Sequence, residues 1–106
     1  MAEIKLTKDN FEAEVIGSEI PVLVDFWAEW CGPCRQLGPI LEALDNELNG
    51  DVKIYKMNVD DSPETVSQFG IRSIPTMFLF KDGKQIDTKV GLSTQSTIKD
   101  WIESHK

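Results

Sequence analysis

The chain has 106 residues, of which 41% are hydrophobic and 27% charged, so its composition is that of an ordinary globular protein rather than a disordered, collagen-like or membrane protein. Its 18 acidic and 11 basic side chains give a net charge of -7, which repels phosphate backbones and anionic lipids and argues against nucleic-acid and membrane binding. We expect one domain spanning residues 1–106.

Short apolar runs alternate with helical patterns in the first half of the chain. A strand is expected at residues 3–6, a helix at 10–16 and a strand at 21–28, whose nearly continuous apolar run is typical of a strand covered on both faces. Apolar residues then recur at spacings of three and four, which predicts a helix with one apolar face, kinked at Pro39. The residues of this face are Leu37, Ile40, Leu41, Leu44 and Leu48.

The second half continues the alternation and ends in a helix. The expected elements are a strand, a helix, the two strands of a hairpin and a helix, at residues 51–60, 62–70, 76–80, 85–90 and 93–106. Ser62 as N-cap, Pro63 at the first helical position and Gly70 at the end bound the middle helix. Asp82 and Gly83 supply the positive φ angles of a tight hairpin turn. The element order indicates an α/β fold with one central sheet and helices on both faces.

Cys31 and Cys34 are the only cysteines of the chain and lie in the stretch WCGPC. As a structural bridge the pair is weak, because closing a four-residue loop contributes roughly 1.9 kcal/mol against roughly 3 for a fifteen-residue loop. A structural zinc site takes four Cys or His ligands, and the only histidine is His105, so we expect no metal. The first ten residues contain no signal-peptide pattern, so we expect a cytoplasmic protein, in which such a pair is catalytic rather than a permanent bridge.

The position of the pair between a strand and a helix favours redox chemistry. Cys31 falls where the helix begins, so unpaired backbone N–H groups and the positive end of the helix dipole favour its thiolate, the form that attacks disulfides. Cys34, one turn later and expected to be less exposed, can reach Cys31 to close a small ring. Gly32 allows a tight turn, and Pro33 fixes φ and lacks an N–H where none is needed. We therefore interpret Cys31 as the nucleophile and Cys34 as the resolving cysteine.

The stretches VDFWAEWCGPC, GIRSIPT, FKDGK and KVG, in this order, resemble the thioredoxin family over nearly the whole chain. The resemblance implies the thioredoxin fold, a central mixed five-strand sheet flanked by four helices, and a general protein-disulfide reductase that carries electrons. It implies disulfide-containing protein substrates, a monomer, and no bound cofactor. A separate thioredoxin reductase would regenerate the dithiol, since the chain has no Gly-rich dinucleotide fingerprint. The alternative is a binding subunit of a larger complex, in which the thiols are incidental.

Two charged residues in the predicted strands carry further hypotheses. Asp25 interrupts a buried apolar run, where a carboxylate is costly unless it is neutral or paired. It is either a structural acid or, as the resemblance implies, the proton acceptor for Cys34. Lys56 is either a solvated strand residue or, by the same resemblance, the cation near Asp25.

The resemblance also implies a substrate groove beside the cysteines. Its expected residues are Trp30, Ile74, Pro75, Val90 and Gly91, with a cis bond before Pro75 that exposes the Ile74 backbone to an extended substrate segment. Three other residues receive structural interpretations. Trp27 and Trp101 are expected in the core, and His105 is expected to be a solvated residue of the tail.

Overall fold

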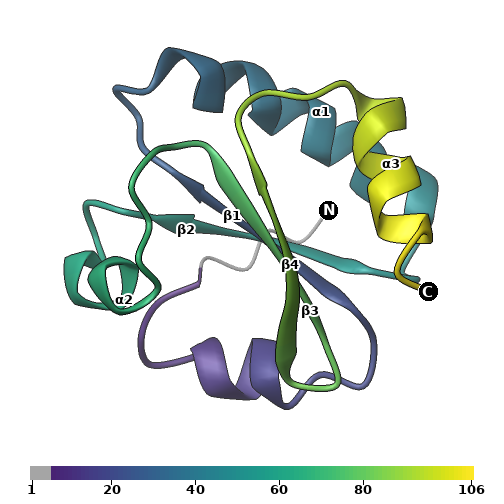
Figure 1. Ribbon diagram of the computed structural model, residues 1–106, viewed down its shortest axis with the longest axis horizontal. Helices are drawn as coiled ribbons and strands as arrows, with labels where there is room; N and C mark the ends of the chain where they lie inside the picture. The colour runs from purple at the N-terminus through teal and green to yellow at the C-terminus, as the bar shows by residue number, and fades with distance from the viewer. Residues whose placement is uncertain (1–5) are drawn as a thin grey trace.

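The computed structural model describes residues 6–106 and consists of a mixed β-sheet with helices on both faces (Figure 1). A short π-helix, η1, precedes the first strand, and three α-helices follow. In chain order the elements are η1 (Glu12–Ile16), β1 (Val22–Trp27), α1 (Gly32–Leu48), β2 (Lys53–Asn58), α2 (Pro63–Gln68), β3 (Thr76–Lys81), β4 (Lys84–Val90) and α3 (Gln95–Glu103).

The described strands lie in the order β2-β1-β3-β4. β1 pairs in parallel with β2 and antiparallel with β3, and β3 pairs antiparallel with β4. Because β1 is paired along both edges and covered on both faces, five of its six residues are buried. The chain leaves the carboxyl end of β1 and enters α1, so the WCGPC segment lies at the end of this central strand, where α1 begins.

Side chains of β1 alternate between two hydrophobic cores. Leu23 belongs to the core beneath α1 and α3, together with Leu37, Leu44 and Ile98. Phe26 and its neighbours on the other face belong to the core beneath η1 and α2 (Figure 1). The alternation places Asp25, two residues after Leu23, on the face that α1 covers.

Most of the predicted elements are confirmed. The predicted apolar face of α1 is buried at Leu37, Leu41, Leu44 and Leu48, whereas Ile40 is only partly buried. Pro39 lies inside this helix, which continues past it to Leu48. The hairpin turn is confirmed, because Asp82 and Gly83 have φ angles of 54° and 78°.

Two predictions about local structure need comment. Ser62 occupies the predicted N-cap position of α2, but its side chain makes no capping hydrogen bond. Its ψ of 56° lies outside the β region from which a cap side chain reaches the first helical N–H groups. The strand expected at residues 3–6 lies outside the described residues except for Leu6, which is buried and donates its N–H to the Lys56 carbonyl at 3.0 Å. Within residues 6–106 the sheet therefore has four strands, against the five that the resemblance implied.

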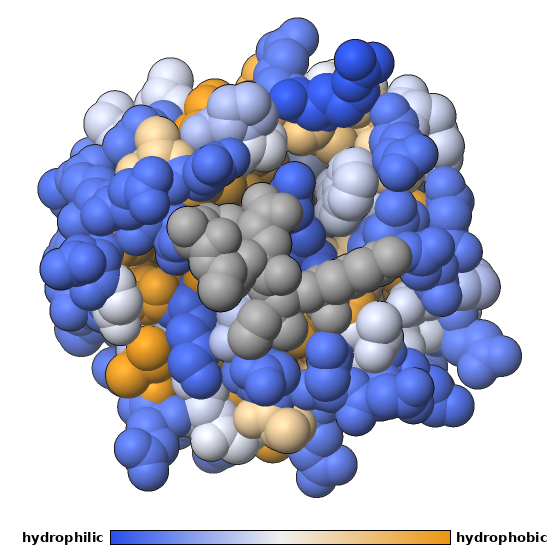
Figure 2. Space-filling view, turned by 180° about the vertical axis from the view of Figure 1, so that it is seen from behind, coloured by the Kyte–Doolittle hydropathy of each residue, from blue (hydrophilic) through white to orange (hydrophobic). Residues whose placement is uncertain are grey.

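The face seen from behind in Figure 2 is largely hydrophilic, and its hydrophobic residues appear in small separate patches. Within residues 6–106 every helix is too short or too polar to cross a bilayer.

Candidate redox site

Cys31 occupies the N-cap position of α1, and its sulfur is bonded to that of Cys34 in a disulfide. Its backbone is extended, with φ −90° and ψ 110°, so the chain turns from strand to helix at this residue. The Cys34 N–H donates to the Cys31 sulfur at 3.2 Å. The cap contact places the sulfur at the positive end of the helix dipole, where negative charge is stabilised.

The two residues between the cysteines explain why Cys34 supplies this contact. Gly32 and Pro33 are the first two residues of α1, and proline has no N–H. The first donor after Pro33 is therefore Cys34, at the third helical position, where a cap normally receives its hydrogen bond. Cys31 is 5% exposed and Cys34 2% exposed, so the predicted difference in exposure is small in this disulfide-bonded form.

Asp25 is completely buried, and neither of its carboxylate oxygens has a hydrogen-bond partner within the described chain. Burial raises the pKa of Asp25 from 3.8 to about 7, although the positive charge of Lys56 lowers it in part. Near neutral pH the carboxyl group is therefore divided between its neutral and charged forms. Such a group can accept a proton from a thiol and return it to solvent.

Lys56 lies beside Asp25, as the resemblance implied. The two residues are register partners across β1 and β2. The Lys56 ammonium lies over the Trp27 ring, 4.7 Å from its centroid, and close to Gly38 of α1. Trp27 is only partly buried, so the core assignment predicted for it holds in part.

The predicted groove residues Trp30 and Ile74 line a common hollow beside the cysteines. The Ile74 carbonyl oxygen lies 3.8 Å from the Cys31 sulfur, and the bond between Ile74 and Pro75 is cis, as the resemblance implied. The Ile74 N–H makes no hydrogen bond within residues 6–106. The backbone of Ile74 therefore remains open to pairing directly beside the reactive sulfur.

Val90 and Gly91 lie on the other side of Pro75 and not in this hollow. The Gly91 N–H donates to the Pro75 carbonyl at 2.9 Å, and Val90 pairs with Thr76 at the end of the sheet. Val90 is 62% exposed and lines a neighbouring hollow. Of the five predicted residues, Trp30 and Ile74 thus line one hollow and Val90 lines a second, whereas Pro75 and Gly91 line neither and are joined by their backbone hydrogen bond.

Asp60 is a site residue that the sequence analysis missed. Its carboxylate accepts the indole N–H of Trp30 at 2.9 Å, which orients a ring that is 70% exposed. The two residues are 30 positions apart, and no local pattern links them. The hollow has five further lining residues that were not predicted, Val59, Val66, Ile71, Arg72 and Ser73.

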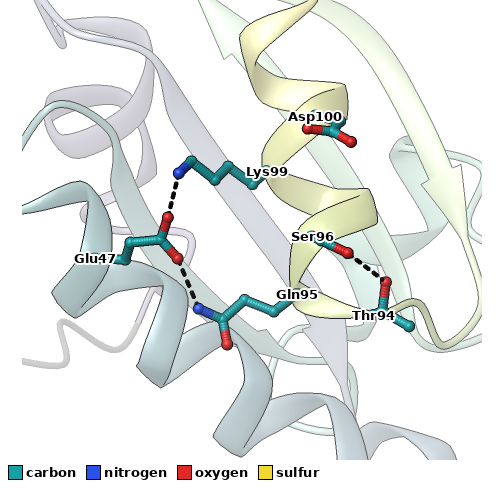
Figure 3. Close-up of a pocket in the computed structure, with 6 residues that line it drawn as sticks. All are labelled: Glu47, Thr94, Gln95, Ser96, Lys99 and Asp100. Carbon is teal, nitrogen blue, oxygen red and sulfur yellow. Dashed lines mark hydrogen bonds and ion pairs between the residues drawn. The ribbon is translucent and has the colours of Figure 1, made fainter.

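A different hollow lies between α1 and α3, away from the cysteines (Figure 3). Glu47 of α1 accepts a hydrogen bond from Gln95 at 2.8 Å and forms an ion pair with Lys99, both of α3. Glu47 and Lys99 are thus already paired with each other and exposed to solvent. No cluster that could hold a metal ion occurs within residues 6–106.

Comparison with known proteins gives a consistent result. The family model described as Thioredoxin matches residues 2–104. The chain is 57% identical to the thioredoxin of Rickettsia conorii over 93 residues, which is 88% of this chain and 89% of that protein. It is 43% identical to thioredoxin 1 of a Nostoc species over 104 residues, covering 98% and 97% of the two chains. It is 42% identical to the thioredoxin of Porphyra purpurea over 105 residues, covering 99% and 98%.

Proposed function

The chain belongs to the thioredoxin family and is a thiol–disulfide oxidoreductase, and we propose that it reduces protein disulfides with Cys31 as the attacking and Cys34 as the resolving sulfur. The observation that carries this division is the position of Cys31 at the N-cap of α1, with its sulfur accepting the Cys34 N–H. A thiolate there is stabilised before it meets a substrate, whereas Cys34 lies within the helix.

The first step is attack of the Cys31 thiolate on one sulfur of a substrate disulfide. A bond forms between Cys31 and that sulfur, the substrate disulfide breaks, and the second substrate sulfur leaves as a thiolate that takes a proton from solvent. The Ile74 backbone and the exposed face of Trp30 position the substrate segment, since both lie in the hollow beside the Cys31 sulfur.

The second step releases the reduced product. Cys34 loses its proton and attacks the Cys31 sulfur, which forms the Cys31–Cys34 disulfide and expels the substrate thiolate. Asp25 accepts the proton, because its pKa of about 7 suits transfer near neutral pH. Neither carboxylate oxygen contacts a donor of the described chain, so the transfer passes through water. Two electrons leave the dithiol and reduce one disulfide to two thiols.

The oxidised pair must then be reduced by another protein. We propose that a thioredoxin reductase supplies the two electrons and that this chain needs no bound cofactor. We further propose that it acts as a cytoplasmic monomer, since reduced thiols are maintained in that compartment.

The test is reduction of insulin disulfides with NADPH and a thioredoxin reductase. Turnover well above that of the reductase alone is expected. Turnover equal to the reductase alone would contradict the proposal and favour the alternative, a binding subunit whose thiols are incidental.

A further inference from the structure

The hollow beside the disulfide is apolar except at one wall. Its seven lining residues are Trp30, Val59, Val66, Ile71, Arg72, Ser73 and Ile74. Arg72 is the only charged residue among them. It stands two positions before Ile74, the residue whose carbonyl lies beside the Cys31 sulfur. A charge at this position of the lining is suited to meet the residues next to a substrate cysteine rather than the cysteine itself.

Arg72 is free to take a partner. It is exposed, and it makes neither an ion pair nor a hydrogen bond through its side chain within residues 6–106. It also lines the second hollow, together with Thr76, Gln85 and Val90. Because Arg72 lines both hollows, a segment bound in either hollow passes this residue.

A negative charge lies next to the Trp30 ring but does not line the hollow. The carboxylate of Asp60 accepts the Trp30 indole N–H at 2.9 Å, so it already has a partner, and Arg72 remains the only charged residue of the lining. The whole chain has a net charge of -7, so its general field repels acidic partners. A local cation in the groove is therefore the feature that would admit a carboxylate close to the site.

We propose that Arg72 is a specificity-determining residue that favours substrate segments with an aspartate or glutamate near the attacked cysteine, an inference that rests on the proposed reductase function. The planar guanidinium binds a carboxylate through two parallel hydrogen bonds, which demands one position of the acid relative to the cysteine. The pair remains exposed, so the gain is modest, about two- to fivefold in kcat/KM.

The experiment uses a set of disulfide-bonded peptides that differ at one position. A glutamate is placed in turn at each site flanking the cysteine, and a glutamine peptide is the reference for each site. Reductase-coupled turnover gives kcat/KM for every pair. For the wild type, the kcat/KM of the glutamate peptide divided by that of the glutamine peptide should be about two to five at one or two adjacent sites and near one at the others.

Two variants separate a local contact from the general field. Arg72→Gln should bring the ratio to about one at every site. Arg35→Gln is the matched control, because Arg35 is an exposed cation of α1 that does not line either hollow, and it should keep the wild-type profile.

Three results would overturn the inference. A flat wild-type profile, or a peak that persists in Arg72→Gln, shows that Arg72 does not select the acid. If the kcat/KM ratio falls equally in Arg72→Gln and Arg35→Gln at every site, the preference comes from the overall charge of the protein and not from a contact with Arg72. In these cases the glutamine peptides are still reduced and the proposed function stands. Failure to reduce any peptide removes the proposed function and the inference with it.

Discussion

Lys56 is the register partner of Asp25, yet its ammonium lies over the Trp27 ring, 4.7 Å from the centroid, and makes no hydrogen bond with the carboxylate. Lys56 therefore acts on Asp25 through its charge alone. Burial raises the pKa of Asp25 more than Lys56 lowers it, so the pKa is about 7. This pKa suits the proton transfer that we propose for Asp25.

Lys56→Met should raise the pKa of Asp25 above 7, by about one unit, because the change removes the charge that opposes burial. NMR titration of the aspartate carboxyl carbon measures this directly. Turnover should shift toward higher pH in the same variant. Lys53→Met is the matched control, since Lys53 lies on the same strand with its side chain toward the other face. An unchanged or lower pKa in Lys56→Met would contradict the account.

Asp25→Asn should stabilise the protein near pH 7. The folded pKa is raised to about 7 from 3.8, so the stability that the neutral carboxyl contributes is complete below 3.8 and is lost as the pH rises to about 7. The loss is on the order of a few kcal/mol. Denaturant unfolding between pH 4 and pH 9 measures the free energy of unfolding of both proteins. The advantage of the variant over the wild type should grow as the pH rises to about 7 and stay constant above that pH.

The same substitution should slow product release, because Cys34 loses its proton acceptor. The expected decrease in turnover is roughly tenfold or more. A variant that is less stable at neutral pH and equally active would leave Asp25 as a structural acid only.

The side chain of Asp87, in β4, contacts Trp101 of α3 and His105, which follows this helix. These contacts correct two sequence predictions. The Trp101 indole donates to Asp87 at 2.8 Å, and the His105 ring lies 2.7 Å from the same oxygen. His105 is thus not a free solvated residue, and Trp101 is only partly buried. The hydrogen bond from Trp101 contributes most to lowering the pKa of Asp87 to about 2, with smaller contributions from Thr88 and His105.

Asp87→Ala should lower the melting temperature by about 5 °C at neutral pH, the shift expected for about 1 kcal/mol in a domain of this size. Because the folded pKa is lowered, the contribution of Asp87 is present above 3.8 and is lost as the pH falls through about 2. The difference from wild type should therefore shrink between pH 4 and pH 2. Asp51→Ala, at an exposed position without a side-chain partner in the described chain, is the control. A constant difference down to pH 2 would contradict the assignment.

Features fixed by local chemistry were predictable from the sequence. The apolar face of α1 follows from residue spacing, and the turn at Asp82 and Gly83 follows from the need for positive φ. Ser62 shows the limit of such reasoning: it stands at the expected position, but its backbone angles prevent its side chain from capping the helix.

Contacts between distant residues could not be predicted. Trp30 meets Asp60, and Asp87 meets His105, because the sheet brings separate elements together. Neither pair leaves a signal in the spacing of the chain. The second hollow could not be predicted for the same reason. Val90 of β4 and Thr76 of β3 both line it because the two strands pair in the sheet.

Trapping of the mixed disulfide tests the division of labour between the two sulfurs most directly. Each single variant, Cys31→Ser and Cys34→Ser, is mixed with a disulfide-bearing substrate, and intact-mass spectrometry measures the covalent adduct. Cys34→Ser should accumulate the adduct, because Cys31 still attacks and nothing releases it, whereas Cys31→Ser should give at most about a tenth of that yield. Equal yields from the two variants, or a larger yield from Cys31→Ser, would contradict the assignment of Cys31 as the nucleophile.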